Sequence, residues 1–224
     1  MTSTLLAAEG VSKAFELESG TLRVLAEVSV SVAEGETVAV TGPSGSGKST
    51  LLGILAGLER PSSGRVLWRG EEVHAWDEER RSAWRRGEVG FIFQNFRLVP
   101  SLTALENAAL PLELVGRSAG DAAQAARGLL AELGLGGRED HYPHQLSGGE
   151  QQRVAIARAY AHGPKVILAD EPTGSLDRET AETVFEALLT ANARRGAALV
   201  VVTHDPAVAG RLSRAVALDR GRRA

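Results

Sequence analysis

The sequence contains no cysteine among its 224 residues, which excludes disulfide bonds and thiolate metal sites. It also lacks long apolar runs, because its longest strongly apolar stretch is AALVVV at 197–202, whereas a membrane-spanning helix needs about 20 residues. The opening stretch, MTSTLLAAEG, has neither the basic region nor the apolar segment of a signal peptide. We therefore expect a cytosolic chain, or one that another protein holds at a membrane.

Strong net charge is also missing. The net charge of −3 and the isoelectric point of about 6.0 give no electrostatic case for a nucleic-acid partner. The apolar fraction of 43% is ordinary for a soluble domain, and the length fits one domain or one domain with a large insertion. Lysine is scarce, since only three of the 25 basic residues are lysines, and one of them, Lys48, lies in a glycine-rich stretch.

Apolar strands and amphipathic helices alternate along most of the chain. The first 35 residues or so are typical of short β segments with turns, and residues 101–139 change character and become helical. In the latter stretch Thr103 and Glu106 have the spacing of a capping box. A buried strand is predicted at 36–42 and further strands at 64–70, 89–94, 165–170 and 197–205. Helices are predicted at 48–58, 77–87, 103–116, 121–135, 148–161 and 178–196. This order predicts an α/β fold with a mostly parallel sheet and an inserted helical subdomain.

A phosphate-binding motif follows the strand at 36–42 and opens a helix. It comprises Gly42, Pro43, Ser44, Gly45, Ser46, Gly47, Lys48 and Ser49, with Thr50 directly after. Glycines allow the backbone N–H groups to wrap a β-phosphate, Lys48 would reach the β- and γ-phosphates, and the Ser49 hydroxyl would bind Mg²⁺. The alternative interpretation is an ordinary glycine-rich turn between a strand and a helix.

Polar side chains follow three further strands. Asp170 and Glu171 end the strand at 165–170, Gln94 ends the one at 89–94, and His204 follows the run at 197–202. Asp170 suits a magnesium shell, Glu171 could activate water, and the Gln94 amide oxygen could complete the metal shell or hold that water. Each residue alone could be a solvated strand end. Together with the phosphate motif they predict one site at the carboxyl edge of the sheet.

A second candidate anion site lies about a hundred residues after the first. In HQLSGGEQQRVAIARAYA, the residues Ser147, Gly148 and Gly149 precede a run with helical spacing. A helix start without bulky side chains presents free N–H groups and the positive end of the helix dipole, so it attracts anions. One small chain thus carries two phosphate-binding patterns.

These motifs identify the family that the chain resembles. GPSGSGKST resembles the Walker A motif, VILADE the Walker B motif and LSGGEQQR the signature of the ATP-binding cassette (ABC) ATPases, and the resemblance covers nearly the full length. Two longer stretches, FIFQNFRLVPSLTALENAALPLELVG and ADEPTGSLD, are similar to ATPases of the lipoprotein-releasing and macrolide-export type. Ser175 stands where that subfamily often has Asn, which is a departure from its pattern.

The resemblance implies a P-loop core at 1–93 and 162–224, with an N-terminal antiparallel β subdomain, and a helical subdomain at 94–161. It implies ATP and Mg²⁺ as cofactors, with Glu171, His204 and Gln94 as catalytic groups and Ser49, Gln94 and Asp170 as metal ligands. The nucleotide would contact the phosphate motif, Phe15, Ser147, Gly148, Gly149 and Asp177. Phe15, where the family more often has Tyr, would stack on adenine, although a core position is an equal alternative.

The resemblance also explains the second phosphate pattern. In the family two subunits face each other head to tail, so the signature of one chain closes over the ATP on the P-loop of the other. An ATP-dependent homodimer is therefore implied, bound to an integral membrane permease on the cytoplasmic face of the cell membrane. Four residues, Phe93, Phe96, Leu98 and Val99, would line the groove for a cytoplasmic helix of that permease, or else belong to the subdomain core.

Two other functions remain as alternatives. The first is an ATP-driven regulatory or mechanical module of the cell-division type, in which nothing is transported and every catalytic residue is the same. The second is a non-membrane ABC protein of DNA repair or translation, which the absence of long coiled coils and of a second cassette disfavours.

Other conspicuous residues are predicted to have structural roles. The helix at 77–88 is typical of a solvated charged face. The remaining histidines show no metal-ligand spacing, and the tryptophans are predicted to pack; these are His74, His141, His144, His162, Trp68, Trp76 and Trp84.

Overall fold

A computed structural model of the chain describes residues 3–18, 20–219 and 221–223. The chain forms two compact units, one of residues 1–85 with 198–224 and the other of residues 86–197. The second unit contains the helices of the predicted subdomain at 94–161 together with two strands and the helix at 178–195. The expected α/β class, with an antiparallel sheet, parallel strands and helices, is confirmed.

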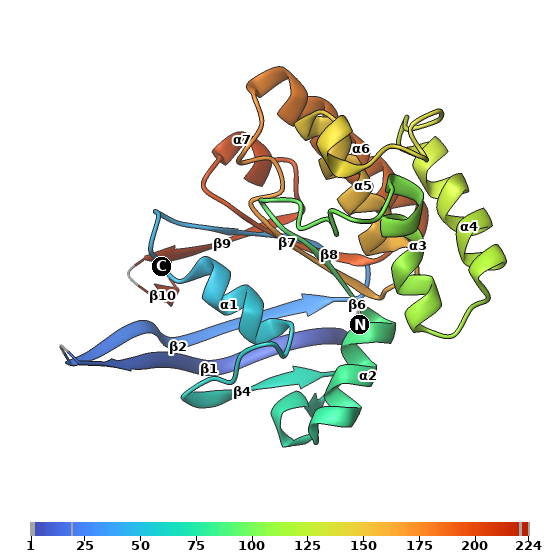
Figure 1. The fold of residues 1–224 in the computed structure, drawn as a ribbon. Coiled ribbons are helices and arrows are strands. Elements are labelled where there is room, and N and C mark those ends of the chain that lie inside the picture. The colour runs from blue at the N-terminus through green and yellow to red at the C-terminus, as the bar shows by residue number, and fades with distance from the viewer. Residues whose placement is uncertain (1–2, 19, 220, 224) are drawn as a thin grey trace. The chain divides into compact units, whose positions relative to one another are not determined.

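The first unit contains an antiparallel sheet of four strands in the order β2-β1-β4-β5 (Figure 1). Its strands are β1 (Thr4–Leu17), β2 (Gly20–Ala33), β4 (Ser63–Trp68) and β5 (Glu71–Glu72). The predicted short β segments are instead two strands of 14 residues each. Register shifts between β1 and β2 explain the difference, because bulges interrupt the alternation of the sequence without ending the pairing.

The same unit holds the parallel strands that carry the phosphate motif. Strand β3 (Thr37–Thr41) lies between β8 (Ala198–Thr203) and β9 (Arg214–Asp219), and β10 (Arg222–Arg223) pairs with β9 in the antiparallel sense. All six residues of β8 are buried, which explains its continuous apolar sequence. The other elements are α1 (Lys48–Leu55), η1 (Val73–Ala75) and α7 (Pro206–Ala209).

The second unit combines two parallel strands with four helices. Strand β6 (Val89–Ile92) pairs with β7 (Val166–Asp170). Helices α3 (Ala104–Leu114), α4 (Ala119–Glu132) and α5 (Gly148–Tyr160) contact one another, and α6 (Arg178–Arg195) contacts α5 (Figure 1). The short helix η2 (Pro143–Gln145) precedes α5. The predicted capping box of α3 is present, because Thr103 and Glu106 each accept a hydrogen bond from the backbone N–H of the other.

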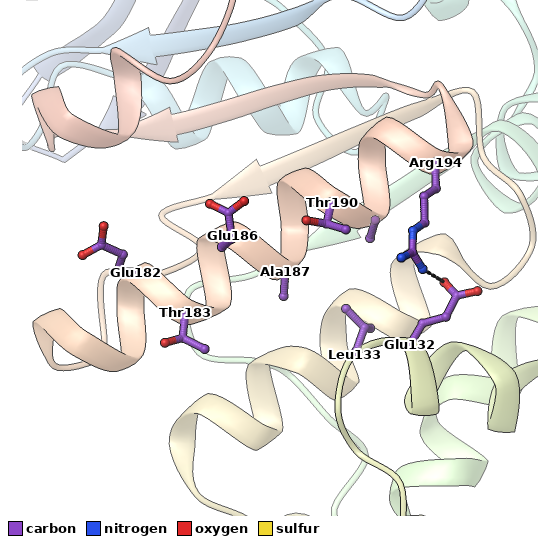
Figure 2. A pocket seen from close by; sticks show the side chains of 9 residues that line it. Glu132, Leu133, Glu182, Thr183, Glu186, Ala187, Thr190 and Arg194 are labelled. Atoms are coloured by element: carbon purple, nitrogen blue, oxygen red, sulfur yellow. Dashed lines mark ion pairs between the residues drawn. The ribbon is translucent and has the colours of Figure 1, made fainter.

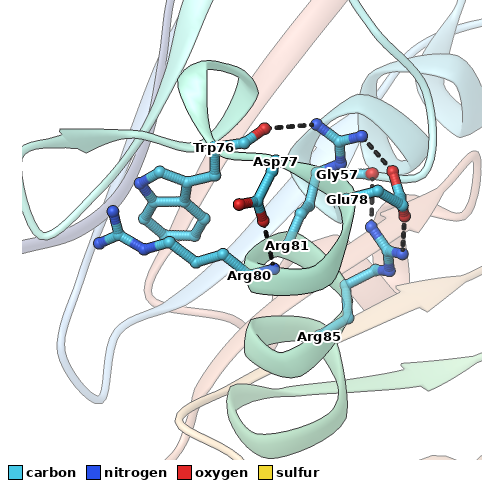
Figure 3. Close-up of polar contacts among 7 residues, drawn as sticks. All are labelled: Gly57, Trp76, Asp77, Glu78, Arg80, Arg81 and Arg85. Atoms are coloured by element: carbon cyan, nitrogen blue, oxygen red, sulfur yellow. Dashed lines mark hydrogen bonds and ion pairs between the residues drawn. The ribbon is translucent and has the colours of Figure 1, made fainter.

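Helix α2 (Glu78–Glu88) links the two units along the chain, and three of its arginines make polar contacts within the protein (Figure 3). Arg81 and Arg85 both pair with Glu78, and Arg85 also donates to the Gly57 carbonyl oxygen at 2.9 Å. Arg80 pairs with Glu71. The side chains of Glu71, Glu78 and Arg80 stay exposed, as the predicted solvated charged face requires, although the Glu78–Arg81 pair is spaced i,i+3.

The three tryptophans form one cluster beside α2. The ring of Trp84 meets Trp68 at 5.4 Å and Trp76 at 5.9 Å between centroids, in edge-to-face geometry. Each ring is at most 9% exposed. The prediction that these residues serve packing is confirmed.

Candidate functional site

The phosphate motif connects β3 to α1 and has the backbone that its glycines predict. Gly42, Gly45 and Gly47 have φ values of 150°, 79° and 89°, in the region that favours glycine. A Cβ atom at Gly42 would lie 2.2 Å from the carbonyl oxygen of Leu218, so no side chain fits there. The helix begins at Lys48, which directs the N–H groups of its first turn toward the loop.

The side chain of Lys48 bonds to the backbone of this same loop. Its Nζ atom donates to the carbonyl oxygens of Gly42 at 2.8 Å and Pro43 at 2.9 Å, and the residue is only 7% exposed. The Ser46 hydroxyl is buried and has no hydrogen-bond partner within the described residues. A buried ammonium, an unpaired hydroxyl and a helix N-terminus at one turn fit a phosphate group.

The register of the parallel strands brings His204 to the same edge as the phosphate motif. Thr41 at the end of β3 pairs with Thr203 at the end of β8, so the residues that follow, Gly42 and His204, leave neighbouring strands together. His204 is exposed. The first unit therefore carries the P-loop and the histidine side by side.

The second unit gathers the remaining strand-end residues in the same way. Ile92 of β6 pairs with Ala169 of β7, so Gln94 and the Asp170–Glu171 pair follow adjacent strand ends. Four residues of β7 are buried and Asp170 is half-buried. Glu171 has a φ of 45°, a strained backbone conformation for a residue with a side chain.

Gly174 separates Gln94 from Glu171. A Cβ atom at Gly174 would lie 3.1 Å from Nε2 of Gln94 and 3.3 Å from Cβ of Glu171. The N–H of Gly174 donates to the Glu171 carbonyl oxygen at 3.0 Å, which makes the turn tight. The predicted catalytic carboxylate and amide of this unit thus flank one glycine.

The signature stretch forms the start of α5. Ser147 is the N-cap, and its hydroxyl and the Glu150 carboxylate make a reciprocal capping box. Arg138 donates to the other carboxylate oxygen of Glu150 at 2.9 Å. The hydrogen bonds from the backbone and hydroxyl of Ser147, with the Arg138 guanidinium, lower the pKa of Glu150 to about 2. The helix start is therefore held by its own side chains.

The signature glycines have a packing role that the sequence did not indicate. A Cβ atom at Gly149 would lie 2.5 Å from Cγ2 of Thr180 in α6, and one at Gly148 would lie 3.2 Å from Cδ2 of Leu176. Gly149 is buried, whereas Ser147 is exposed. The glycines thus allow α5 to approach the start of α6 closely.

Two other predicted nucleotide residues have local environments of their own. Asp177 is the N-cap of α6, and a hydrogen bond from Thr180 lowers its pKa. Phe15 is 38% exposed, and the ammonium of Lys13 lies 4.9 Å from its ring centre. Its exposure favours an accessible ring over a core position, and stacking on adenine stays a prediction.

The sequence did not indicate that three polar side chains hold the loop after β6, and one of them, Ser175, was noted only as a departure from the subfamily pattern. Gln152, Arg158 and Ser175 donate to backbone carbonyls of Phe93, Gln94, Phe96, Arg97 and Pro172. The sequence signal was Arg158, a charged residue within the otherwise uncharged stretch AIARAYA at 155–161.

A surface groove of about 570 Å³ lies apart from these residues, between the end of α4 and one face of α6 (Figure 2). Glu182, Glu186 and Thr190 line it, and Arg194 pairs there with Glu132. It contains none of the predicted site residues. Among the described residues, no group of three or more His, Cys, Asp or Glu side chains is arranged to hold a metal, and no helix combines the length and apolarity that crossing a membrane requires.

Comparison with known families decides the assignment. The sequence profile of the ABC transporter family matches residues 25–174, which contain the P-loop, the loop after β6, the signature and the end of β7. The chain belongs to the ABC transporter ATP-binding family. Membership makes it an ATP-binding and ATP-hydrolysing subunit of an ABC transporter.

Relatives of this ABC subunit cover nearly its whole length. It is 45% identical to the lipoprotein-releasing system ATP-binding protein LolD of Idiomarina loihiensis, over 99% of this chain and 97% of that protein. It is 51% identical to the ABC transporter ATP-binding protein YbbA of Escherichia coli K12, over 89% and 88% of the two chains. A solved dimeric post-hydrolysis state of the ATP-binding cassette MJ0796, bound to ADP and Pi, has a TM-score of 0.90 and 39% identity, covering 98% of this chain and 96% of that one.

Proposed function

We propose that this ABC subunit drives a membrane permease of the lipoprotein-releasing or macrolide-export type, through ATP-dependent closure of a homodimer. The observation that carries the proposal is the 45% identity to a lipoprotein-releasing ATPase over 99% of the chain. The similarity to a dimeric cassette bound to ADP and Pi supports the dimer. The subunit would act on the cytoplasmic face of the membrane that holds its permease.

The P-loop would bind the triphosphate. Lys48 would exchange its bonds to the Gly42 and Pro43 carbonyls for phosphate oxygens, and the buried Ser46 hydroxyl would gain a partner. The Ser49 hydroxyl and Thr50 follow at the first turn of α1, where N–H groups attract anions. The ring of Phe15 would cover the adenine.

Hydrolysis would depend on residues at the strand ends of both units. Ser49, Asp170 and Gln94 supply oxygen ligands of the kind that Mg²⁺ prefers. When bound, Mg²⁺ neutralises charge on the β- and γ-phosphates. Glu171 would accept a proton from the attacking water, and His204 would contact the γ-phosphate and hold that water in place.

The signature would serve the nucleotide of the partner subunit. Ser147 is exposed at the N-terminus of α5, a helix of 13 residues whose dipole favours an anion there. Gly148 and Gly149 leave that helix start without side chains, and Asp177 would approach the partner across the dimer. One chain alone would then lack a complete hydrolytic site.

The groove for the permease would include the loop after β6. Phe93, Phe96, Leu98 and Val99 are all half-buried, which supports an apolar surface accessible to a partner over a fully packed core. A short amphipathic helix of the permease would fit such a surface.

The test is purification of the full complex from native membranes through a tag on this chain, followed by reconstitution into vesicles. The proposal expects an integral membrane permease to co-purify and ATP to release an embedded lipid-anchored protein into solution. The Glu171→Gln variant of the same complex is the control without turnover. ATP hydrolysis with a bound membrane partner, but with neither release of lipid-anchored protein nor ATP-dependent movement of a macrolide across the vesicle membrane, would overturn the transport assignment and favour a regulatory module.

A further inference from the structure

The loop after β6 contains a strained turn next to Gln94. Phe96 and Arg97 have φ values of 54° and 48°, so two consecutive residues with side chains adopt the left-handed conformation. Such conformations are unfavourable and persist where surrounding contacts impose them. The backbone bonds that the turn makes within the described part of the chain are short-range, from Phe96 N–H to the Phe93 carbonyl oxygen at 3.2 Å and from Arg97 N–H to that of Asn95.

Arg158, near the end of the signature helix α5, holds this turn. Its Nη1 donates to the Arg97 carbonyl oxygen at 2.6 Å, and its Nη2 donates to that of Phe96 at 2.9 Å. The planar guanidinium thus bonds both strained residues at once, which an ammonium could not do with the same geometry. Burial lowers the pKa of Arg158. Arginine side chains in proteins nevertheless stay protonated at neutral pH, so the group acts as a cation.

Two neighbouring side chains complete the attachment. Gln152, fully buried in α5, donates through Nε2 to the Pro172 carbonyl oxygen at 2.6 Å and is 3.4 Å from that of Phe93. The Ser175 hydroxyl donates to the Gln94 carbonyl oxygen at 3.0 Å. The loop is therefore attached at successive residues, with Arg158 at its most strained point.

We infer that Arg158 is a positioning residue, which fixes the turn after Gln94 to the signature helix so that the Gln94 amide stays against Gly174 and Glu171. This inference rests on the proposed role of Gln94 in hydrolysis. Because Arg158 bonds both residues of the turn, α5 and the loop after β6 would move together. Displacement of the loop by a bound permease helix would then be transmitted to the signature helix through the guanidinium.

The first test measures loop protection by hydrogen exchange and mass spectrometry, in the full-length chain. Arg158→Ala should raise the exchange rate of the Phe96 amide about tenfold or more, and Arg158→Lys should raise it less because it can still reach one carbonyl. Tyr160→Phe is the matched control: it removes a buried 2.9 Å bond to Asn192 from the same helix without touching the loop. Unchanged exchange at 93–97 in both Arg158 variants would overturn the inference, and Arg158→Lys alone decides it if Arg158→Ala does not fold.

The second test separates positioning from general stability. Arg158→Ala should lower kcat about tenfold or more, because small misplacements of catalytic groups are costly, while KM for ATP changes less than about threefold. Tyr160→Phe should keep the wild-type kcat. Gln94→Ala is measured in parallel. If neither Gln94→Ala nor Arg158→Ala alters kcat while exchange rises, the role of Gln94 is wrong and Arg158 still holds the turn; if only Gln94→Ala lowers kcat, positioning by Arg158 is overturned.

Discussion

The Ser175 hydroxyl donates a hydrogen bond to the backbone carbonyl oxygen of Gln94 at 3.0 Å, across 81 positions of sequence. It connects the loop after β7, which carries Glu171, to the loop after β6. The subfamily that the chain resembles often has Asn at this position, and in this chain the serine hydroxyl makes the bond. Its presence links the two candidate catalytic loops of the second unit.

Loss of this bond should have a small and separable effect. Ser175→Ala removes one neutral hydrogen bond at an exposed residue, so we expect the free energy of unfolding to fall by about 1 kcal/mol or less. We expect a smaller fall in kcat than for Arg158→Ala, because Arg158 makes two charge-assisted bonds. Urea denaturation and steady-state ATPase assays check this. A larger loss of kcat in Ser175→Ala than in Arg158→Ala would contradict the ranking.

Lys48→Ala should weaken ATP binding strongly. A hydrogen bond to a charged group contributes about 1.5–3 kcal/mol, so we expect Kd for ATP to rise about 10- to 100-fold and turnover to be abolished. Calorimetric titration with ATP measures Kd. The exposed Lys165 provides the matched control, since Lys165→Ala removes the same charge far along the sequence from the motif. Wild-type affinity in Lys48→Ala would refute the P-loop assignment.

Glu171→Gln should separate binding from hydrolysis. The amide cannot accept the proton of the attacking water, so kcat should fall about 10²- to 10⁴-fold while ATP still binds. We expect this variant to elute as an ATP-dependent dimer in size-exclusion chromatography. Glu182→Gln, at an exposed position of α6, should hydrolyse ATP like the wild type. Near-normal turnover in Glu171→Gln would remove that residue from its assigned role.

Ser147→Arg tests whether the signature acts on the partner's nucleotide. The substitution should leave ATP binding by a single chain intact, because its P-loop is unchanged, and should abolish ATP-dependent dimerisation. Loss of the N-cap itself costs about 0.5–2 kcal/mol, and Ser118→Ala, which removes the cap of α4, controls for it.

Mixing variants sharpens this test. In a heterodimer of Ser147→Arg and Lys48→Ala chains, one site joins the intact P-loop of the first to the intact signature of the second. We therefore expect partial recovery of ATPase activity that neither variant has alone. Heterodimers that form, as native mass spectrometry would report, yet stay inactive would argue against a site shared by two chains.

The capping box of α5 should contribute stability that depends on pH. The folded pKa of Glu150 is about 2, below its ordinary value of 4.5, so its contribution is present above pH 4.5 and is lost as pH falls toward 2. Glu150→Gln removes this titration. The difference in unfolding free energy between wild type and Glu150→Gln should shrink from pH 6 to pH 3, measured by urea denaturation. A difference that stays constant with pH would contradict the assignment.

The sequence by itself determined the local features of this protein. The glycines of the P-loop, the capping box of Thr103 and Glu106, and the buried strands with polar ends were all readable within a few residues. Such features depend on backbone conformation and on contacts between residues that are close in the sequence, so a short stretch of sequence is enough to predict them. The order of strands and helices and the family motifs also predicted the α/β class and ATP hydrolysis.

The tertiary structure alone decided which distant residues meet. It paired Thr41 with Thr203, packed Gly149 against Thr180 and directed Arg158 to carbonyls about 60 residues earlier in the chain. Gly149 looked like a phosphate-binding residue in the sequence, and the fold gave it a packing role as well. These long-range contacts depend on strand register and on how closely the helices approach one another. Both are set by the whole set of buried contacts, so no single position in the sequence predicts them.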